Sequence, residues 1–280
     1  MKKLFVAKNI GFCFGVKRAV EQTEKLLEKL QSLSTIGDIV HNPIIMEKLK
    51  SKGLNVYNSI EKLNGKYFLI RSHGLSKKEI EKIKKLGFEV FDLTCPFVKK
   101  IHNLVENLNK KGYYIIIIGN KNHPEVLSIK GYGKKIYIIE KKEDFFNFRR
   151  KKMEKVAVIG QTTLNFEYFL DFVKYIVNKI NAKEFLIINT ICKVTEEREK
   201  EGIEIAKKSD AVFVLGGKES SNTKKLFNIC KNFCTNTFHI EKISDLSKIN
   251  FKKFKKIGIV SGTSTPHFFI NEVIEYIKKV

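Results

Sequence analysis

The stretch "KLFVAKNIGFC" (residues 3–13) is an apolar run that ends in a cysteine, directly before a helical pattern. Two later stretches have the same design, "FEVFDLTC" (88–95) and "EFLIINTIC" (184–192). Each run is typical of a strand, and apolar residues at helical spacing follow it, as at Val16, Val20 and Leu27. Alternating strands and helices indicate parallel α/β structure with a cysteine at each of three strand-to-helix junctions.

A second motif follows each cysteine at a constant distance. Counting 28 residues from the cysteines reaches His41 in "GDIVHNP", His123 in "GNKNHPE" and Ser220 in "GGKESSN". A glycine lies four residues before each of these positions, at Gly37, Gly119 and Gly216. A third strand in each unit ends in a polar turn, in "YFLIRSHGLS", "VAVIGQTTLN" and "IGIVSGTSTP". Three units with one internal spacing indicate an internal repeat.

The last unit has no closing strand of its own after its final helical pattern, and "KLFVA" at residues 3–7 is the natural candidate to supply it. We therefore predict an α/β fold of three small, parallel lobes related by pseudo-threefold symmetry around a central site. The expected boundaries are 14–95, 96–192, and 193–280 together with 1–13.

The cysteines are candidate metal ligands because ligands of parallel sheets bind beyond the carboxyl ends of the strands. Were the three units to converge, Cys13, Cys95 and Cys192 would meet at one point. Three widely spaced cysteines suit an iron–sulfur cluster with one open iron better than a zinc site. The alternative is three unrelated buried thiols. Cys230 and Cys234, in "CKNFC", have no counterparts in the other units and are expected to be structural.

Short polar side chains near the predicted helix starts form a candidate anion site, for phosphate or diphosphate. They are His41, His73, His123, Ser220, Ser221, Asn222 and Ser264. Ordinary loop histidines remain the alternative, and His102, His239 and His267 are expected to be surface or structural residues. Glu125, in "HPEV", is either a carboxylate favoured by the helix dipole or a proton donor with a raised pKa, sharing a hydrogen-bond relay with Thr162.

The formal net charge of +23 is compatible with two kinds of partner, nucleic acid or a small anionic substrate. The lysines are scattered along the chain, which favours the small anion. Lys8 interrupts the first apolar run, no cleavage motif follows it, and no apolar stretch reaches the length of a membrane span. We therefore expect a cytoplasmic protein with neither membrane nor nucleic-acid partners, whose cysteines are thiols rather than disulfides.

A series of motifs extends over essentially the whole chain: "GFCFGVKRAV", "HNP", "RSHG", "DLTCPFV", "NHPEV", "GQTTL", "NTIC", "SSNT" and "SGTSTP". In this order they resemble the IspH/LytB family, the 4-hydroxy-3-methylbut-2-enyl diphosphate reductases of the non-mevalonate (MEP/DXP) isoprenoid pathway. The resemblance implies that Cys13, Cys95 and Cys192 bind a 4Fe–4S cluster with one open iron, or a 3Fe–4S cluster after degradation. The chain departs from the family pattern at "LSIKGYG" after "HPEV" and at Asn189, which replaces a common acidic residue.

The resemblance also implies a reaction, a reductive removal of the C4 hydroxyl that gives isopentenyl and dimethylallyl diphosphates. Glu125 would deliver the proton, with Thr162 beside the substrate hydroxyl, and ferredoxin or flavodoxin would supply two electrons. The remaining polar set would bind the substrate, mostly at its diphosphate: His41, His73, His123, Ser220, Ser221, Asn222 and Ser264. The alternatives are an open-cluster dehydratase of a phosphorylated hydroxy compound and a basic, metal-stabilised nucleic-acid-binding protein.

Overall fold

The computed structural model describes residues 2–147, 153–250 and 253–279, and these contain three four-stranded, fully parallel sheets. The chain packs as two compact units. The unit that we call terminal comprises Met1–Val20, Val40–Ser51 and Lys193–Val280, and it holds one sheet. The central unit comprises Glu21–Ile39 and Lys52–Cys192 and holds two sheets. The α/β fold with three sheets is as predicted, whereas the exact lobe boundaries stay a prediction.

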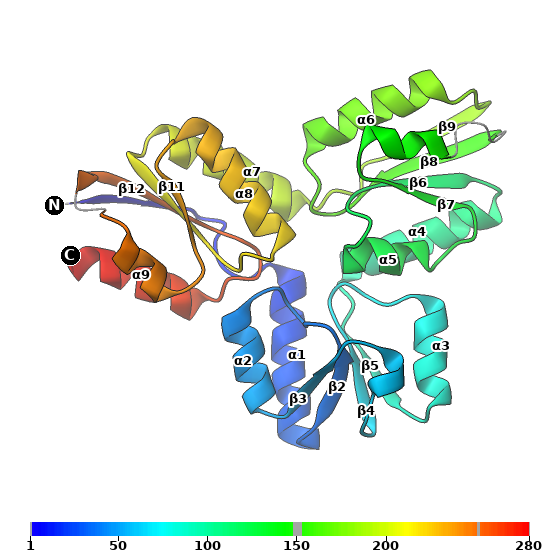
Figure 1. Ribbon diagram of the computed structural model, residues 1–280, viewed down its shortest axis with the longest axis horizontal. Helices are drawn as coiled ribbons and strands as arrows, with labels where there is room; N and C mark the ends of the chain where they lie inside the picture. Colours follow the sequence, from blue (N-terminus) through cyan, green and yellow to red (C-terminus); the bar gives the residue numbers. More distant parts are fainter. Residues whose placement is uncertain (1, 148–152, 251–252, 280) are drawn as a thin grey trace. The chain divides into compact units, whose positions relative to one another are not determined.

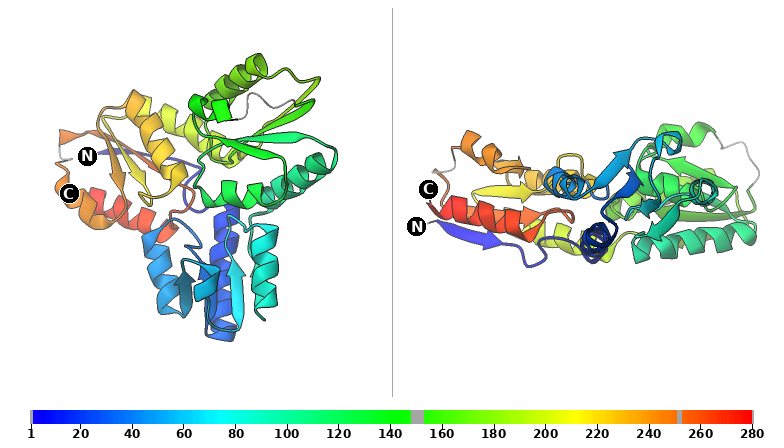
Figure 2. Two further views of the ribbon diagram at one scale, coloured as in Figure 1. Left: turned by 45° about the vertical axis from the view of Figure 1, so that its right-hand side comes forward. Right: turned by 90° about the horizontal axis from the view of Figure 1, so that it is seen from below.

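The terminal sheet joins the two ends of the chain. Its strand order is β1-β12-β10-β11, and Lys3 of β1 lies opposite Lys256 of β12. The strands are β1 (Lys3–Val6), β10 (Ala211–Leu215), β11 (Thr237–Ile240) and β12 (Lys256–Ser261). Figures 1 and 2 show both chain ends beside this sheet. The prediction that the N-terminal strand completes the last sheet is confirmed, although β1 ends seven residues before Cys13, earlier than the apolar run suggested.

Helices cover both faces of the terminal sheet. Val212 and Val214 of β10 pack with residues of α7 (Lys193–Lys207) and α8 (Ser221–Phe233). Phe213 and Leu215, which point to the opposite face because strand side chains alternate, pack with α9 (His267–Lys279). Figure 1 shows α9 and the pair α7 and α8 on opposite sides of this sheet. Ile44 of α2 (Pro43–Ser51) packs against the α9 side.

The two sheets of the central unit repeat this order, β5-β4-β2-β3 and β9-β8-β6-β7. The strands of the first are β2 (Leu33–Ile36), β3 (Leu54–Tyr57), β4 (Tyr67–Ile70) and β5 (Glu89–Asp92). Those of the second are β6 (Tyr114–Ile118), β7 (Ile136–Ile139), β8 (Lys155–Gly160) and β9 (Glu184–Ile188). In every sheet the strand that precedes a proposed cysteine ligand, β1, β5 or β9, lies at one edge.

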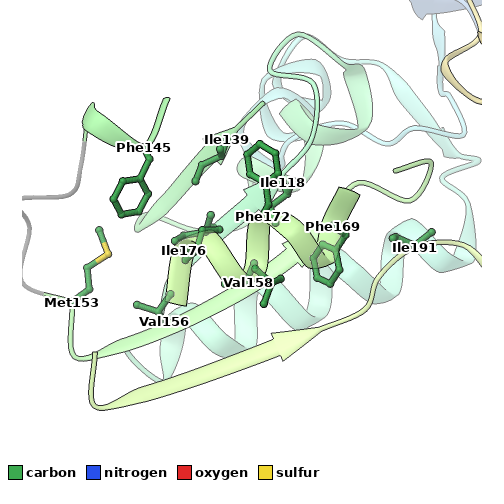
Figure 3. Packing of buried hydrophobic residues seen from close by; sticks show 12 residues of the cluster. Ile118, Ile139, Phe145, Met153, Val156, Val158, Phe169, Phe172, Ile176 and Ile191 are labelled. Carbon is green, nitrogen blue, oxygen red and sulfur yellow. The ribbon is translucent and has the colours of Figure 1, made fainter. Parts of the chain in front are cut away.

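The run of four isoleucines in β6 shows why this strand is central. Ile115 and Ile117 pack with α4 (Pro96–Lys110) and α5 (Pro124–Lys130), on one face of the sheet. Ile116 and Ile118 pack on the other face with α6 (Phe166–Lys179), whose Phe169, Phe172 and Ile176 lie against the strands in Figure 3. All four isoleucines are fully buried, as expected for a parallel strand covered on both sides.

The remaining helices complete the connections. They are α1 (Phe14–Leu30), α3 (Lys77–Lys85), and the short 3₁₀ segments η1 (Ile60–Lys62), η2 (Lys142–Asn147) and η3 (Ile243–Lys248). The helix α3 begins at a capping box, in which Ser76 and Glu79 satisfy each other's backbone N–H groups. Among the described residues, no helix is both long and apolar enough to cross a membrane.

Backbone hydrogen bonds confirm the internal repeat. The N–H of Gly37, Gly119 and Gly216 donates in each case, at 2.9 Å, to the last carbonyl of the adjacent outer strand. The accepting residues are Tyr57 of β3, Ile139 of β7 and Ile240 of β11. The glycine that precedes His41, His123 or Ser220 by four residues therefore occupies the same position in all three sheets.

A buried histidine links two helices of the central unit. His102 of α4 is 2% exposed, its Nε2 is 2.9 Å from Ser128 Oγ of α5, and its ring stacks on Tyr132 with centroids 3.9 Å apart. Burial lowers the pKa of His102 to about 4, with Lys99 acting in the same direction and Asp92 opposing it. The imidazole is therefore neutral at pH 7, in a structural position.

We predict that Phe5→Pro destabilises the protein more than Leu4→Pro. The Lys3 N–H donates to the carbonyl of Lys255, directly before β12, and the Ala7 N–H donates to that of Ile259 in β12. The alternation of a parallel ladder therefore directs the Phe5 N–H to β12 and the Leu4 N–H away from it. The lost hydrogen bond makes Phe5→Pro about 1–3 kcal/mol costlier. Denaturant unfolding followed by circular dichroism measures both variants. Equal costs would mean that the pairing of β1 contributes nothing to stability.

We also predict that His102 makes the folded state sensitive to acid. As the pH falls below the ordinary histidine value of about 6.5, the unfolded chain protonates before the folded one. Unfolding is thus favoured increasingly down to the folded pKa of about 4. The difference in unfolding free energy between wild type and His102→Gln should change by about 3 kcal/mol over this range, to the disadvantage of wild type. A pH-independent difference between the two proteins would contradict this.

Candidate functional site

The three predicted cysteine ligands are held by equivalent backbone hydrogen bonds. Cys13 donates its N–H to the Thr263 carbonyl at 3.0 Å, Cys95 to Ser72 at 2.9 Å, and Cys192 to Thr162 at 2.8 Å. Each accepting residue lies two positions beyond the end of the neighbouring strand, after β12, β4 and β8. Cys13 belongs to the terminal unit, and Cys95 and Cys192 belong to the central unit.

All three cysteines are partly exposed and stand directly before helices, α1, α4 and α7. At a helix start, backbone N–H groups and the helix dipole place positive charge beside each sulfur. The Val16 N–H, for example, donates to Cys13 Sγ at 3.5 Å. Cys230 and Cys234 differ, since both are buried and burial raises their pKa values, that of Cys230 to about 12.

The turn before each cysteine of the central unit is closed by a side chain three residues earlier. Asp92 Oδ1 accepts the Thr94 N–H at 2.9 Å, and Asn189 Oδ1 accepts the Ile191 N–H at 3.0 Å. Asn189 therefore makes the same turn contact that Asp92 makes, without a negative charge.

Glu125 and Thr162 are joined by two hydrogen bonds within the central unit. Glu125 is 4% exposed, and its carboxylate accepts from the Thr162 N–H at 2.8 Å and from the Thr162 hydroxyl at 2.6 Å. Burial raises the pKa of Glu125, and the two hydrogen bonds from Thr162 oppose that shift. The sequence-based pairing of these two residues agrees with this geometry, and the raised pKa is the property that a proton donor needs.

His73 and His123 also lie together in the central unit. Their rings meet edge to face with centroids 5.5 Å apart. His123 is the N-cap of α5, and its Nδ1 accepts the Glu125 N–H at 3.2 Å. Two imidazoles and a buried carboxyl group therefore gather at the start of one helix.

In the terminal unit, His41 lies beside the turn that follows β12. Ser264 donates its hydroxyl to the His41 carbonyl at 3.2 Å. Gly217 approaches the same carbonyl so closely that a Cβ at this position would lie 2.3 Å from the oxygen. Only glycine fits at residue 217 without moving the backbone of His41, which explains the second glycine of "GGKESSN".

Ser220, Ser221 and Asn222 form the start of α8. Ser220 is its N-cap and accepts the Thr223 N–H at 3.3 Å. Asn222 is 5% exposed, and its Nδ2 is buried without a hydrogen-bond partner among the described residues. A buried donor of this kind is costly unless a ligand accepts its hydrogen bond. The helix start and the donor together suit an anion.

Arg198 is a residue of the candidate site that sequence reasoning missed. It is 5% exposed and donates to the Ser261 carbonyl at 3.0 Å and to the Gly11 carbonyl at 2.7 Å. The Gly11 N–H in turn donates to Ser261 Oγ at 2.9 Å, so this cluster fixes the loop that leads to Cys13. Within "TEEREK" the arginine reads as a charge on a solvated helix, and no local signal marks it.

Of the two other histidines of the terminal unit, His239 is partly buried and His267 is exposed, which agrees with the expected structural or surface positions. His239 Nε2 lies 3.0 Å from the Gly216 carbonyl, and its ring stacks on Phe227. His267 covers Gly11, where a Cβ would lie 2.3 Å from its Nε2. Gly11 has φ +88°, a backbone conformation that favours glycine.

The donor set fits an iron–sulfur cluster better than it fits three structural thiols. Each of the three cysteines is partly exposed at a helix start, whereas the two cysteines outside the repeat are buried with raised pKa values. A cluster is held by cysteine sulfurs, and single cysteines at three separate junctions can provide them without a local Cys pair. The ligand set itself stays a prediction.

The chain is similar to known proteins over nearly its whole length. The family model described as LytB protein matches residues 4–278. The chain is 43% identical to the 4-hydroxy-3-methylbut-2-enyl diphosphate reductase of Caldanaerobacter subterraneus subsp. tengcongensis, over 99% of this chain and 97% of that protein. It is 40% identical to the enzyme of the same name from Dictyoglomus turgidum, again over 99% and 97% of the two chains.

Solved structures are similar as well. One is described as (E)-4-hydroxy-3-methyl-but-2-enyl diphosphate reductase, the terminal enzyme of the non-mevalonate pathway, with a TM-score of 0.73, 38% identity and full coverage of both chains. Another, the E-1-hydroxy-2-methyl-but-2-enyl-4-diphosphate reductase from Plasmodium falciparum, has a TM-score of 0.90 at 28% identity, over 99% of this chain and 88% of that one. With a family match and relatives over nearly its whole length, the chain belongs to the LytB protein family.

Proposed function

We propose that the chain is a 4-hydroxy-3-methylbut-2-enyl diphosphate reductase, which removes the C4 hydroxyl of (E)-4-hydroxy-3-methylbut-2-enyl diphosphate and releases isopentenyl and dimethylallyl diphosphates. The full-length relatives bear this name. The structural observation that carries the proposal is the position of Thr162. Its N–H and hydroxyl hold Glu125, while its carbonyl holds the backbone of Cys192.

The balance of the reaction defines what the site must do. The allylic C–O bond breaks, two electrons and two protons enter, and water leaves with one of the protons while the carbon skeleton takes the other. Hydroxide is a poor leaving group, so its departure needs a proton at the oxygen. The family is iron–sulfur-dependent. A 4Fe–4S cluster held by Cys13, Cys95 and Cys192 would act as a Lewis acid at its open iron and would pass electrons to the substrate. A ferredoxin or flavodoxin would provide these electrons.

Glu125 would supply the proton to the leaving oxygen. Its burial keeps the carboxyl protonated to a higher pH than an exposed glutamate, since burial raises its pKa. The two hydrogen bonds from Thr162 fix both carboxyl oxygens, which sets the direction in which the proton is offered. The Thr162 hydroxyl lies beside the same group and would share the contact with the substrate oxygen.

The diphosphate would bind to the polar residues around the helix starts. In the terminal unit, the start of α8 offers Ser220, Ser221 and Asn222, with the buried Asn222 Nδ2 available as a donor. His41 and Ser264 lie together in the same unit, and His73 and His123 lie together in the central unit. The net charge of +23 favours an anionic substrate at long range.

The two alternatives from the sequence are not favoured. Net dehydration would need no external electrons, and the full-length relatives are all named as reductases. The nucleic-acid-binding alternative is not favoured either, because the relatives that match over nearly the whole chain are named as enzymes that act on a small diphosphate.

Replacing Glu125 tests its role in proton delivery. Glu125→Gln keeps the shape and the contacts to Thr162 but cannot release a proton, so we expect kcat to fall by about 10²- to 10⁴-fold while KM and the visible spectrum of the anaerobic protein stay near wild type. In wild type, kcat should decline as the pH rises through the raised pKa of Glu125, because the protonated form is the donor. Full activity of Glu125→Gln would exclude this residue as the proton donor.

Cysteine substitutions test the ligand set. Cys95→Ser should lose cluster iron and sulfide, because a hydroxyl is a poor ligand for a cluster held by thiolates. Cys230→Ser is the matched control, since its side chain is fully buried in the core of the terminal unit and outside the repeat. It should keep its iron and sulfide at a modest cost in stability. Anaerobic metal and sulfide analysis decides, and loss of the cluster in Cys230→Ser alone would mean that the wrong thiols were chosen.

A further inference from the structure

The proposed acid stands on the short helix α5, which spans only Pro124–Lys130. Ser128 follows Glu125 by three residues on this helix, and both are buried, at 2% and 4% exposure. Residues three apart lie on the same side of a helix, so the positions of Ser128 and Glu125 are coupled. Whatever holds Ser128 therefore also holds the carboxyl group.

His102 is the residue that holds Ser128. Its Nε2 lies 2.9 Å from Ser128 Oγ, and one face of its ring stacks on Tyr132. His102 stands on α4, the helix that begins directly after Cys95. The hydrogen bond thus joins the helix of the proposed cluster ligand to the helix of the proposed acid, and both lie in the central unit.

The backbone at Gly74 packs closely against both His102 and Ser128. Gly74 has φ +79°, and a Cβ there would lie 2.6 Å from Ser128 Oγ and 2.7 Å from His102 Cε1. Gly74 follows His73, whose ring meets that of His123. The His102–Ser128 pair therefore lies where the segments carrying His73, Cys95 and Glu125 come together.

We propose that His102 is a positioning residue for the reaction, which orients Glu125 and His123 through its hydrogen bond to Ser128. The proposal rests on the function proposed above. Apolar packing alone would anchor α5, since Val126 and Ile129 are fully buried with Ile101 and Val105 of α4. Such packing is non-directional, whereas one buried hydrogen bond fixes how the helix is turned about its axis. The rotation of α5 about its axis determines the orientation of the Glu125 carboxyl group.

The test is a double-mutant cycle of Ser128→Ala, His102→Leu and the double variant, on the cluster-loaded protein. Each single variant should lower kcat about tenfold, since small displacements of a catalytic group are costly, and KM should stay near the wild-type value. The double variant should be no slower than the slower single variant, because both changes remove the same hydrogen bond. His102→Gln, which places an amide near the Nε2 position, should recover most of the lost kcat.

A spectroscopic readout tests the same claim without turnover. Infrared difference spectra against Glu125→Gln identify the C=O stretch of the protonated Glu125 carboxyl. In Ser128→Ala and His102→Leu this band should shift or broaden, and in His102→Gln it should return towards the wild-type position. The band reports Glu125 even where wild type proves inactive on the diphosphate, so failure of the proposed function and failure of the positioning role are distinguishable.

Ser34→Ala is the matched control for loss of a buried hydroxyl. Ser34 of β2 is 1% exposed, and its hydroxyl donates to the Asn64 carbonyl, outside α4 and α5. The thermal midpoint of Ser34→Ala should fall about as far as that of Ser128→Ala. The kcat and the infrared band of Glu125 should stay unchanged in Ser34→Ala. Additive losses in the cycle, or an unchanged Glu125 band in Ser128→Ala, would overturn the proposal, as would a kcat loss that follows iron content alone.

Discussion

The candidate site depends on three equivalent hydrogen bonds, one in each sheet. In each of them a cysteine N–H donates to a carbonyl in the turn after the neighbouring strand. In each sheet the strand that leads to the cysteine lies at the edge, beside a strand whose following turn carries a candidate site residue, namely Ser264, His73 or Thr162. The bonds of Cys13, Cys95 and Cys192 measure 2.8–3.0 Å. Because the strands are parallel, their carboxyl ends lie on one side, and a thiol and its polar neighbours are presented together.

Thr162, in the turn after β8, connects a proposed cluster ligand to the proposed acid. Its carbonyl accepts from Cys192, while its N–H and hydroxyl donate to Glu125. A displacement of this residue would move both a proposed ligand and the proposed acid. Arg198 has a related role in the terminal unit, where its guanidinium holds the Gly11 and Ser261 carbonyls and so fixes the approach to Cys13. Backbone contacts, rather than side-chain packing alone, therefore determine where the chemistry would take place.

Burial gives Glu125 its chemical character. In water, a glutamate at a helix start would be ionised at neutral pH, and the helix dipole would favour that state further. The enclosed position raises the pKa of Glu125 despite the two hydrogen bonds from Thr162. The same principle acts in the opposite direction on His102, which burial keeps neutral so that it can serve as a directional link between helices.

The sequence by itself determined the parallel α/β class, the threefold repeat and the use of the N-terminal strand in the last sheet. These follow from periodicity and from spacings such as the 28 residues between Cys95 and His123, which are local properties of the chain. Only the tertiary structure decided that Arg198 and His102 are buried and that β1 ends at Val6. Burial arises from contacts between segments far apart in the chain, such as Arg198 and Gly11, and no local pattern encodes them.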